Sequence, residues 1–155
     1  MEETDLDLAY MAGLFDGEGC IVIDTNKWIA KNGELRRYHF LEVQVCNTDE
    51  WAVRQFQFFF GGSIYWRADK IWVWQITSQK AAFALTMLLP YLHIKKAQAG
   101  IGIRFQERIG RCLLLTEEEM AVREAQKVLI SNLNKRRITA EEVRIQPIQE
   151  VSNGL

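Results

Sequence analysis

The segment that decides the fold is Met11-Ala12-Gly13-Leu14-Phe15-Asp16-Gly17-Glu18-Gly19. It continues a run of apolar residues at helical spacing that begins near Leu6, with Asp5 as a candidate N-cap. A glycine inside a helix costs about 1 kcal/mol relative to alanine, so the small residues spaced four apart, Ala9, Gly13 and Gly17, require a compensating contact. Such a stripe lets a second backbone approach closely, and it predicts tight packing of one helix on another.

Two acidic residues at the end of this helix are a second unusual feature. Asp16 and Glu18 lie near the negative end of the helix macrodipole, where a carboxylate costs a few tenths to about 1 kcal/mol. A bound cation would remove that cost. The segment by itself is equally compatible with a helix that ends in a glycine-rich turn with solvated acids.

The residues that follow predict two β-hairpins separated by a helix. The predicted strands alternate or are rich in aromatic and β-branched residues, and Asn32-Gly33 is a strong signal for the first hairpin turn. Thr48 or Asp49 is a candidate N-cap for the helix between the hairpins, which Gly61-Gly62 would end. In chain order we expect a helix over 6–17, strands over 20–28 and 36–47, a helix over 49–60, strands over 63–67 and 71–77, and helices over 78–89, 96–108 and 116–133.

This order predicts an α+β fold, αββαββα with an antiparallel four-stranded sheet and additional C-terminal helices. The length of 155 residues and the 48% hydrophobic composition suit one buried core. We therefore expect a single domain over residues 1–155, with its core at about 5–110 and the C-terminal helices and a basic loop at about 112–145. Thr116 and Glu119 form a capping box that supports the start of the last helix.

Composition argues against several classes of protein. No uncharged apolar run approaches the roughly 18 to 20 residues of a membrane span, and the acidic N-terminus is unlike a signal peptide. The three cysteines are odd in number and lack CxxC spacing, so they predict neither a disulfide framework nor a zinc site. We expect an intracellular protein, from the cytoplasm of a prokaryote or from an organelle, with no membrane partner.

The charge is unevenly distributed along the chain. The formal net charge of −1 argues by itself against a nucleic-acid ligand. From Cys20 to Arg111, however, 13 Lys or Arg stand against 7 Asp or Glu, whereas the two flanks together hold 6 against 13. A basic middle is compatible with DNA binding, and it is also common on ordinary solvated surfaces.

The nine-residue segment resembles the signature of the LAGLIDADG homing endonucleases. Met11, Phe15, Gly17 and Glu18 are mild replacements within that signature, and the segment lies on a helix that leads directly into a hairpin, as it does in the family. The resemblance extends over roughly 6–143 and is weaker outside the motif. It implies the LAGLIDADG fold with a saddle-shaped sheet, and a sequence-specific endodeoxyribonuclease that makes a double-strand break at a long pseudo-palindromic site.

The resemblance also implies a homodimer, because two motif helices pack together in this family and the chain holds one motif. The interface would include Ala9, Gly13, Leu14 and Gly17. Each helix would bring its Glu18 carboxylate and the Gly17 carbonyl to divalent metals. Mg²⁺ between hard oxygen ligands would activate a water molecule and neutralise the charge that develops during phosphodiester cleavage.

Two further catalytic residues follow from the resemblance. Lys95 stands where single-motif members carry an active-site lysine, which would orient water or offset phosphate charge, although a solvated residue at a helix start is the alternative. Asn47 stands where relatives carry a polar residue that supports the water network. The family's frequent arginine is missing, since Glu50 and Trp51 occupy its place and Arg54 comes one turn later.

The second predicted strand separates an apolar face from a mixed polar and aromatic face of the kind that reads base edges in the major groove. Three consecutive basic residues before a second capping box, Thr139 to Glu142, suit contacts with phosphates. A half-exposed sheet and a basic surface loop are the ordinary alternatives. The expected DNA contacts are Arg36, Tyr38, Glu42, Gln44, Arg67, Gln75, Thr77, Lys135, Arg136 and Arg137.

Two other functions are open on the same fold. One is an intron-splicing maturase, for which intron RNA would be a partner, and the other is a DNA-binding regulator that does not cut. The intact acid at Glu18 favours cutting over the regulator. A small α+β binding protein with a merely glycine-rich helix is a third alternative, and it would be monomeric.

Overall fold

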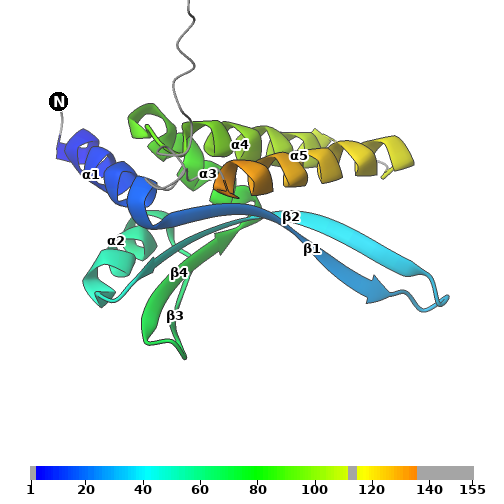
Figure 1. Ribbon diagram of the computed structural model, residues 1–155, viewed down its shortest axis with the longest axis horizontal. Coiled ribbons are helices and arrows are strands. Elements are labelled where there is room, and N and C mark those ends of the chain that lie inside the picture. Colours follow the sequence, from blue (N-terminus) through cyan, green and yellow to red (C-terminus); the bar gives the residue numbers. More distant parts are fainter. Residues whose placement is uncertain (1–2, 112–114, 136–155) are drawn as a thin grey trace, which may run out of the picture.

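Figure 1 shows the computed structural model of the chain, which describes residues 3–111 and 115–135. The predicted order of elements is confirmed. The helices are α1 (Glu3–Glu18), α2 (Glu50–Phe60), α3 (Ser78–Leu88), the short 3₁₀ helix η1 (Leu89–Tyr91), α4 (Lys96–Arg111) and α5 (Glu117–Lys135). The strands are β1 (Gly19–Ile29), β2 (Leu35–Asn47), β3 (Ser63–Arg67) and β4 (Ile71–Thr77). Within the described ranges, no helix combines the length and the apolar character that crossing a membrane requires.

The four strands form one antiparallel sheet in the order β1-β2-β4-β3. The two hairpins lie side by side because β2 and β4 pair in the middle, with Glu42 opposite Thr77 and Asn47 opposite Trp72. The predicted turn of the first hairpin is confirmed, since Gly33 has a φ of 80° and donates its N–H to the Ala30 carbonyl oxygen at 2.8 Å. The first hairpin is much the longer, with strands of 11 and 13 residues against 5 and 7 in the second.

One face of the sheet carries the hydrophobic core. Ile21, Leu41, Val43 and Trp74 lie on this face, and the helices bury them completely. From His39 onward burial alternates along β2, so every second side chain turns toward the helices and the others turn away. Helix α4 packs particularly closely, because a Cβ atom on Gly102 would lie 3.0 Å from Leu41 Cδ1.

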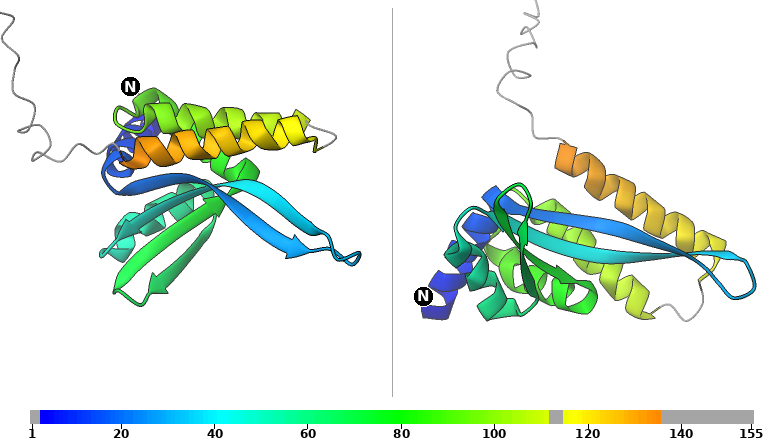
Figure 2. Two further views of the ribbon diagram at one scale, coloured as in Figure 1. Left: turned by 45° about the vertical axis from the view of Figure 1, so that its right-hand side comes forward. Right: turned by 90° about the horizontal axis from the view of Figure 1, so that it is seen from below.

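The opposite face of the sheet is uncovered. Figure 1 shows both hairpins curving away from the helices, so that the sheet forms an arch with the helices on its outer side. The view from below in Figure 2 shows the strands in front of the helices, and among the described residues no helix occupies the concave side. The polar and aromatic face of β2 therefore lies on the concave side of the arch, which no described helix covers (Figure 1 and Figure 2).

Two predictions about helix caps need correction. Asp5 does not cap α1, because it lies inside that helix and its carboxylate accepts a hydrogen bond from the Tyr91 hydroxyl at 2.9 Å. The capping box of α5 is only half formed. The Thr116 hydroxyl accepts the Glu119 N–H at 3.1 Å as predicted, but the Glu119 carboxylate binds two arginines of α4 and α5 instead, Arg108 and Arg123.

Val73 is completely buried, although it lies on the uncovered face of the sheet. The reason is its place on the central strand β4, where Cys46 of β2 and Tyr65 of β3 flank it on both sides. A short side chain between two larger neighbours is covered even without a helix above it.

Candidate functional site

The predicted motif forms the last turns of α1 and the junction with β1. The helix ends at Glu18 and the strand begins at Gly19, with no loop between them. A Cβ atom on Gly19 would lie 2.5 Å from the carbonyl oxygen of Phe15 and 2.5 Å from its ring, so only glycine fits this junction. The abrupt change of direction leaves the Glu18 side chain exposed while Phe15 is buried in the core.

Asp16 lies on the opposite side of α1 from Glu18 and points into the protein. It is 5% exposed and accepts three backbone hydrogen bonds, from His93 and Ile94 to Oδ2 at 2.8 and 3.1 Å, and from Lys95 to Oδ1 at 2.9 Å. These N–H groups directly precede the first residue of α4, where a helix has unsatisfied donors. The cost of the negative charge of Asp16 at the end of α1 is therefore offset by backbone N–H donors rather than by a cation.

The environment of Asp16 also determines its charge. Burial alone would raise the pKa of Asp16, but the N–H groups of His93, Lys95 and Ile94 and the positive charge of Lys95 outweigh burial and hold the pKa below its ordinary value of 3.8. Asp16 is thus an ionised side chain with both oxygens engaged inside the protein. Glu18 is the acid of the motif that remains accessible to a ligand.

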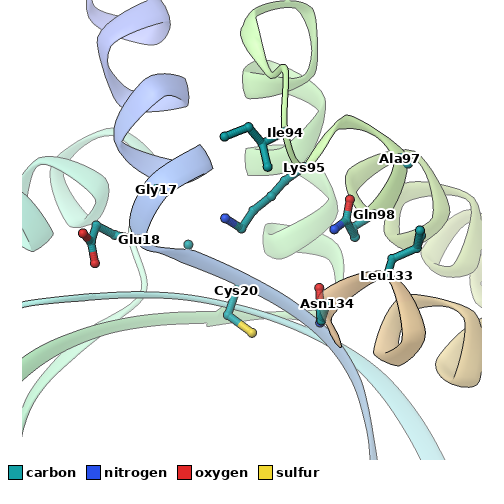
Figure 3. A pocket seen from close by; sticks show the side chains of 10 residues that line it. Gly17, Glu18, Cys20, Ile94, Lys95, Ala97, Gln98, Leu133 and Asn134 are labelled. Carbon is teal, nitrogen blue, oxygen red and sulfur yellow. The ribbon is translucent and has the colours of Figure 1, made fainter. Parts of the chain in front are cut away.

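Lys95 is buried, so the alternative of a solvated lysine is wrong. Its side chain is only 6% exposed, whereas the next residue, Lys96, is exposed. The Lys95 amine donates a hydrogen bond to the main-chain carbonyl oxygen of Asp16. Figure 3 shows this side chain reaching from the start of α4 toward the end of α1. Asp16 thus holds Lys95 at two points, by its backbone N–H and by its amine.

A pocket lies where the end of α1, the start of β1, the start of α4 and the end of α5 meet (Figure 3). It brings together three residues that the sequence analysis assigned to the active site, Gly17, Glu18 and Lys95, although Lys95 is 77 positions away from Glu18 in the chain. Other polar residues join them from three elements. These are Cys20 of β1, Gln98 of α4 and Asn134 of α5.

Asn47 is not among the residues that line this pocket. It ends β2, and its Oδ1 atom accepts the Asp49 N–H at 2.8 Å in the turn that leads into α2. Arg54, the arginine nearest to the expected position, pairs with Glu50 on the surface of α2, with Nε 2.8 Å from Oε1. The structure therefore gives Asn47 a local role in the turn, and its predicted catalytic role stays a prediction.

A single chain offers few ligands for a divalent metal at this site. Across residues 3–111 and 115–135, no group of three or more His, Cys, Asp or Glu side chains is arranged to hold a metal ion. Glu18 has an exposed carboxylate of the hard, oxygen-donor type that Mg²⁺ prefers. The chemistry of Glu18 thus fits a ligand of a divalent metal, but within the described residues it does not make a complete metal site.

The outer side of α1 carries an exposed stripe of small and apolar residues. A Cβ atom on Gly13 or Gly17 would meet nothing within 4 Å, in contrast to Gly19. Leu6 and Tyr10 extend the stripe toward the N-terminus and are 56% and 55% exposed. The fold of one chain therefore does not explain why Gly13 and Gly17 are glycines. The predicted interface residues are all at least partly exposed: Ala9, Gly13, Leu14 and Gly17.

Seven of the ten predicted DNA contacts share the uncovered face of the sheet. The pairing of the strands places them there, on β2, β3 and β4. They are Arg36, Tyr38, Glu42, Gln44, Arg67, Gln75 and Thr77. Tyr38 stacks on Phe40 of the same face, with ring centroids 6.4 Å apart and planes 9° apart. The face combines charged, amide and aromatic groups, as a surface that contacts base edges requires.

Several of these polar side chains bind one another. The Gln44 amide donates a hydrogen bond to Oε1 of the Glu42 carboxylate at 2.7 Å, and the Gln75 amide donates one to Oε2. Arg67 forks onto Asp69, with Nε 2.8 Å from Oδ1 and Nη2 2.7 Å from Oδ2. The orientations of the guanidinium and of the two amides are thus set before any ligand binds.

Helix α5 is fastened along β1. Its Asn134 side chain donates to the Ile21 carbonyl oxygen at 2.9 Å, and the Lys127 amine donates to the Thr25 hydroxyl at 2.7 Å. These contacts place the exposed Lys135, the last residue of α5, near the same end of the molecule as the pocket. The remaining predicted phosphate contacts, Arg136 and Arg137, and the capping box over 139–142 lie outside the described residues.

Two features of the site were not anticipated from the sequence. The role of Asp16 in holding the start of α4 was missed, although its two-residue offset from Glu18 turns it by about 200° to the inner side of the helix. This offset, read from the sequence, indicates that Asp16 and Glu18 lie on opposite sides of the helix. The link from Glu42 to Gln44 lies within β2, but the link to Gln75 joins two strands, and only their register reveals it.

Solved structures of other proteins share the fold described above. The structure resembles the homing endonuclease I-CvuI, solved in complex with the I-CreI target, with a TM-score of 0.72, 23% identity, and 92% of this chain and 94% of that chain covered. It also resembles the archaeal intron-encoded homing endonuclease I-Vdi141I, solved with DNA, with a TM-score of 0.69, 14% identity, and 84% and 86% covered. A search of curated proteins found no match.

The sequence itself decides the family. Residues 11–106 match the family model described as LAGLIDADG endonuclease. The match begins at the motif, spans both hairpins and includes Lys95. Because it covers more than half of the chain, it shows that this protein belongs to the LAGLIDADG endonuclease family.

Proposed function

We propose that the protein is a homing endonuclease that acts as a homodimer and, with Mg²⁺, cuts both strands of a long pseudo-palindromic DNA site. The observation that carries this proposal is an exposed Glu18 at the end of a helix whose outer glycines the single chain does not need. One chain supplies one accessible motif carboxylate, and a second copy packed on the α1 stripe would supply the other. An isologous contact of this kind brings both Glu18 residues near the twofold axis.

The residues around the pocket suit phosphodiester hydrolysis. Bound Mg²⁺ would activate the attacking water molecule and neutralise the phosphate. Glu18 would hold the metal, together with the Gly17 carbonyl oxygen. Lys95, which Asp16 holds at the edge of the same pocket, would stabilise the transition state with its positive charge. A positive group held in advance loses no free energy to reorganisation during the reaction.

DNA is the proposed substrate because the uncovered face of the sheet is concave (Figure 1) and carries charged, amide and aromatic side chains, which are suited to contacts with base edges. A two-stranded β ribbon fits the major groove of B-DNA. The similar structure of I-CvuI holds a DNA target, and we carry this class of ligand over to the present chain. Two arches side by side would span a long site, and Lys135 would contact the backbone near the pocket.

The decisive experiment measures cleavage of a randomised DNA duplex library in Mg²⁺ by the wild-type protein and by Glu18→Gln. We expect double-strand cleavage of a small set of sequences, and a loss of about 1,000-fold or more in the variant, since its neutral amide binds metal poorly. Glu118→Gln, which removes an exposed carboxylate from the first turn of α5, is the matched control and should cut normally.

The outcomes separate the competing functions. Selective binding without cleavage in Mg²⁺ would contradict the nuclease proposal and support a regulator. Normal cleavage by Glu18→Gln would show that the metal is held elsewhere. Binding of structured intron RNA without DNA cleavage would support a maturase.

The homodimer is tested separately at Gly13. A Cβ atom there meets nothing within 4 Å and Gly13 is exposed, so a leucine should leave the monomer folded, but it would hold apart two packed α1 helices. We expect the wild type to sediment as a dimer at micromolar concentration and Gly13→Leu as a monomer. Gly100→Ala, inside α4 and 3.4 Å from a flexible arginine end, is the control and should remain dimeric. A monomeric wild type would overturn the homodimer.

A further inference from the structure

The middle of the uncovered sheet face contains three linked side chains, which we call the Glu42 cluster (Glu42, Gln44 and Gln75). Glu42 and Gln44 lie on β2, and Gln75 lies opposite Gln44 on β4. The Glu42 carboxylate accepts the Gln44 amide at 2.7 Å on one oxygen and the Gln75 amide on the other. All three are partly buried between the two central strands, so the cluster is part of the sheet surface rather than a set of separate solvated chains.

The carboxylate determines how both amides are turned. A free glutamine amide can rotate by 180° and exchange its N–H₂ and C=O groups, so it serves donors and acceptors equally. Next to Glu42, rotation would replace a charge-assisted hydrogen bond with a contact between two acceptor oxygens. One N–H of each amide is therefore bound to Glu42, and the carbonyl oxygens are directed away from the carboxylate.

This fixed pattern favours one class of base edge. In the major groove, adenine and cytosine present an amino donor, whereas guanine and thymine present oxygen acceptors. A cluster of negative charge and outward carbonyl oxygens accepts from an amino group and repels a keto oxygen. Every base pair has one amino base and one keto base across the groove, so the cluster distinguishes the strand on which each lies.

We propose that Glu42 is a specificity-determining residue, which makes the cluster select adenine or cytosine over guanine or thymine on one strand in each half-site. The inference rests on the proposed DNA substrate. A carboxylate on a surface that approaches phosphates weakens binding to any DNA. The presence of Glu42 on this face therefore supports a role in selecting bases. Glu42 thus exchanges general affinity for selectivity.

The test compares the wild type with Glu42→Gln by sequencing the molecules that each binds from a randomised DNA duplex library in Ca²⁺. The wild type should prefer an amino base by roughly tenfold at one position repeated in both half-sites. In the variant, which keeps the shape but not the charge, this preference should fall to about threefold or less while the other positions are unchanged. Affinity for random duplex at low salt should rise by about threefold, since one like charge is lost.

Asp24 provides the matched control. It lies on the same face, on β1 opposite Phe40, and its carboxylate binds the Thr25 N–H rather than a glutamine. Asp24→Asn should raise the affinity for random duplex similarly and leave every base preference intact. Gln75→Leu, which removes one arm of the cluster, should weaken the preference at the same position.

The outcomes are distinct. An unchanged preference in Glu42→Gln, an equal loss in Asp24→Asn, or a wild-type preference for keto bases at the position that responds to Glu42 would each overturn the inference and leave the endonuclease intact. A wild-type protein that selects no duplex at all would overturn the proposed DNA substrate itself. Thermal unfolding of each variant, monitored by circular dichroism, verifies that a lost preference is not a lost fold.

Discussion

The two sides of the α1 C-terminus differ sharply, although they belong to the same motif. On the inner side, Asp16 is buried and holds three backbone N–H groups at the start of α4. On the outer side, Glu18 is exposed beside Gly17, where an added Cβ atom would meet nothing within 4 Å. The inner side completes the fold of one chain. On the outer side, no contact among the described residues accounts for the glycines at positions 13 and 17.

The difference shows that two carboxylates in one motif need not share a role. Burial with many donors fixes a charge as part of the structure, whereas exposure leaves a charge free to bind a ligand. Lys95 connects the two sides, since Asp16 positions it and it borders the pocket that Glu18 also lines. Stability measurements should respond to Asp16, and activity should respond to Glu18 and Lys95.

The largest effect on stability is expected for Asp16→Ala. The variant leaves three N–H groups at the start of α4 without their acceptor, and we expect the free energy of unfolding to fall by about 3 kcal/mol. Urea unfolding followed by circular dichroism measures it. Glu18→Ala, on the exposed side, should change the same quantity by less than about 0.5 kcal/mol. Equal losses in the two variants would remove the distinction between the two sides.

The next effect concerns activity and tests Lys95. Lys95→Met retains a long buried side chain but removes the charge, and we expect the cleavage rate at saturating DNA to fall by about 100-fold. The affinity for the same DNA in Ca²⁺ should change by less than about threefold, because the Lys95 charge is expected to act in the transition state rather than in DNA binding. Lys96→Met, at the exposed neighbouring position, is the control. A similar loss of cleavage in that control would show that position 95 has no special role.

A smaller effect is expected from pH on the stability that Asp16 provides. The folded pKa lies below the ordinary value of 3.8, so this contribution is complete above about pH 5 and is lost as the pH falls through the folded value. Asp16→Asn should be less stable than the wild type by about 1–2 kcal/mol at pH 7, with the difference shrinking below about pH 4. Urea unfolding in EDTA at pH values between about 2.5 and 7 measures this difference in the free energy of unfolding. A difference that stays constant to the lowest pH would contradict the assigned role of the charge.

The smallest effect is a gain in stability. Glu18 lies at the C-terminal end of α1, where a negative charge opposes the macrodipole, and the metal-free protein carries that cost. Glu18→Gln should therefore raise the free energy of unfolding in EDTA by about 0.5 kcal/mol while it abolishes cleavage. A clear loss of stability in EDTA would indicate that Glu18 has a structural role as Asp16 does.

Much of the fold followed from local patterns. Asn32-Gly33 and Gly61 marked the end of a strand and of a helix, because positive φ angles favour glycine at such points. Asp49 was one of two predicted caps for α2, and its side chain accepts the Trp51 N–H at 2.9 Å. Predictions that depended on neighbours from other elements were less successful. Asp5 was the predicted N-cap of α1, but it lies inside that helix and accepts a hydrogen bond from the Tyr91 hydroxyl.

The sequence by itself determined the order of elements, the motif with Glu18 at its end, and the basic middle of the chain, since these depend on residue type and spacing. Tertiary structure alone decided that Asp16 is structural, that Lys95 is buried, and that Glu42 joins two amides. Each of these depends on hydrogen bonds between groups 33 to 79 positions apart or on the register of neighbouring strands. Such contacts form only when packing brings the two segments together, and no local pattern records them.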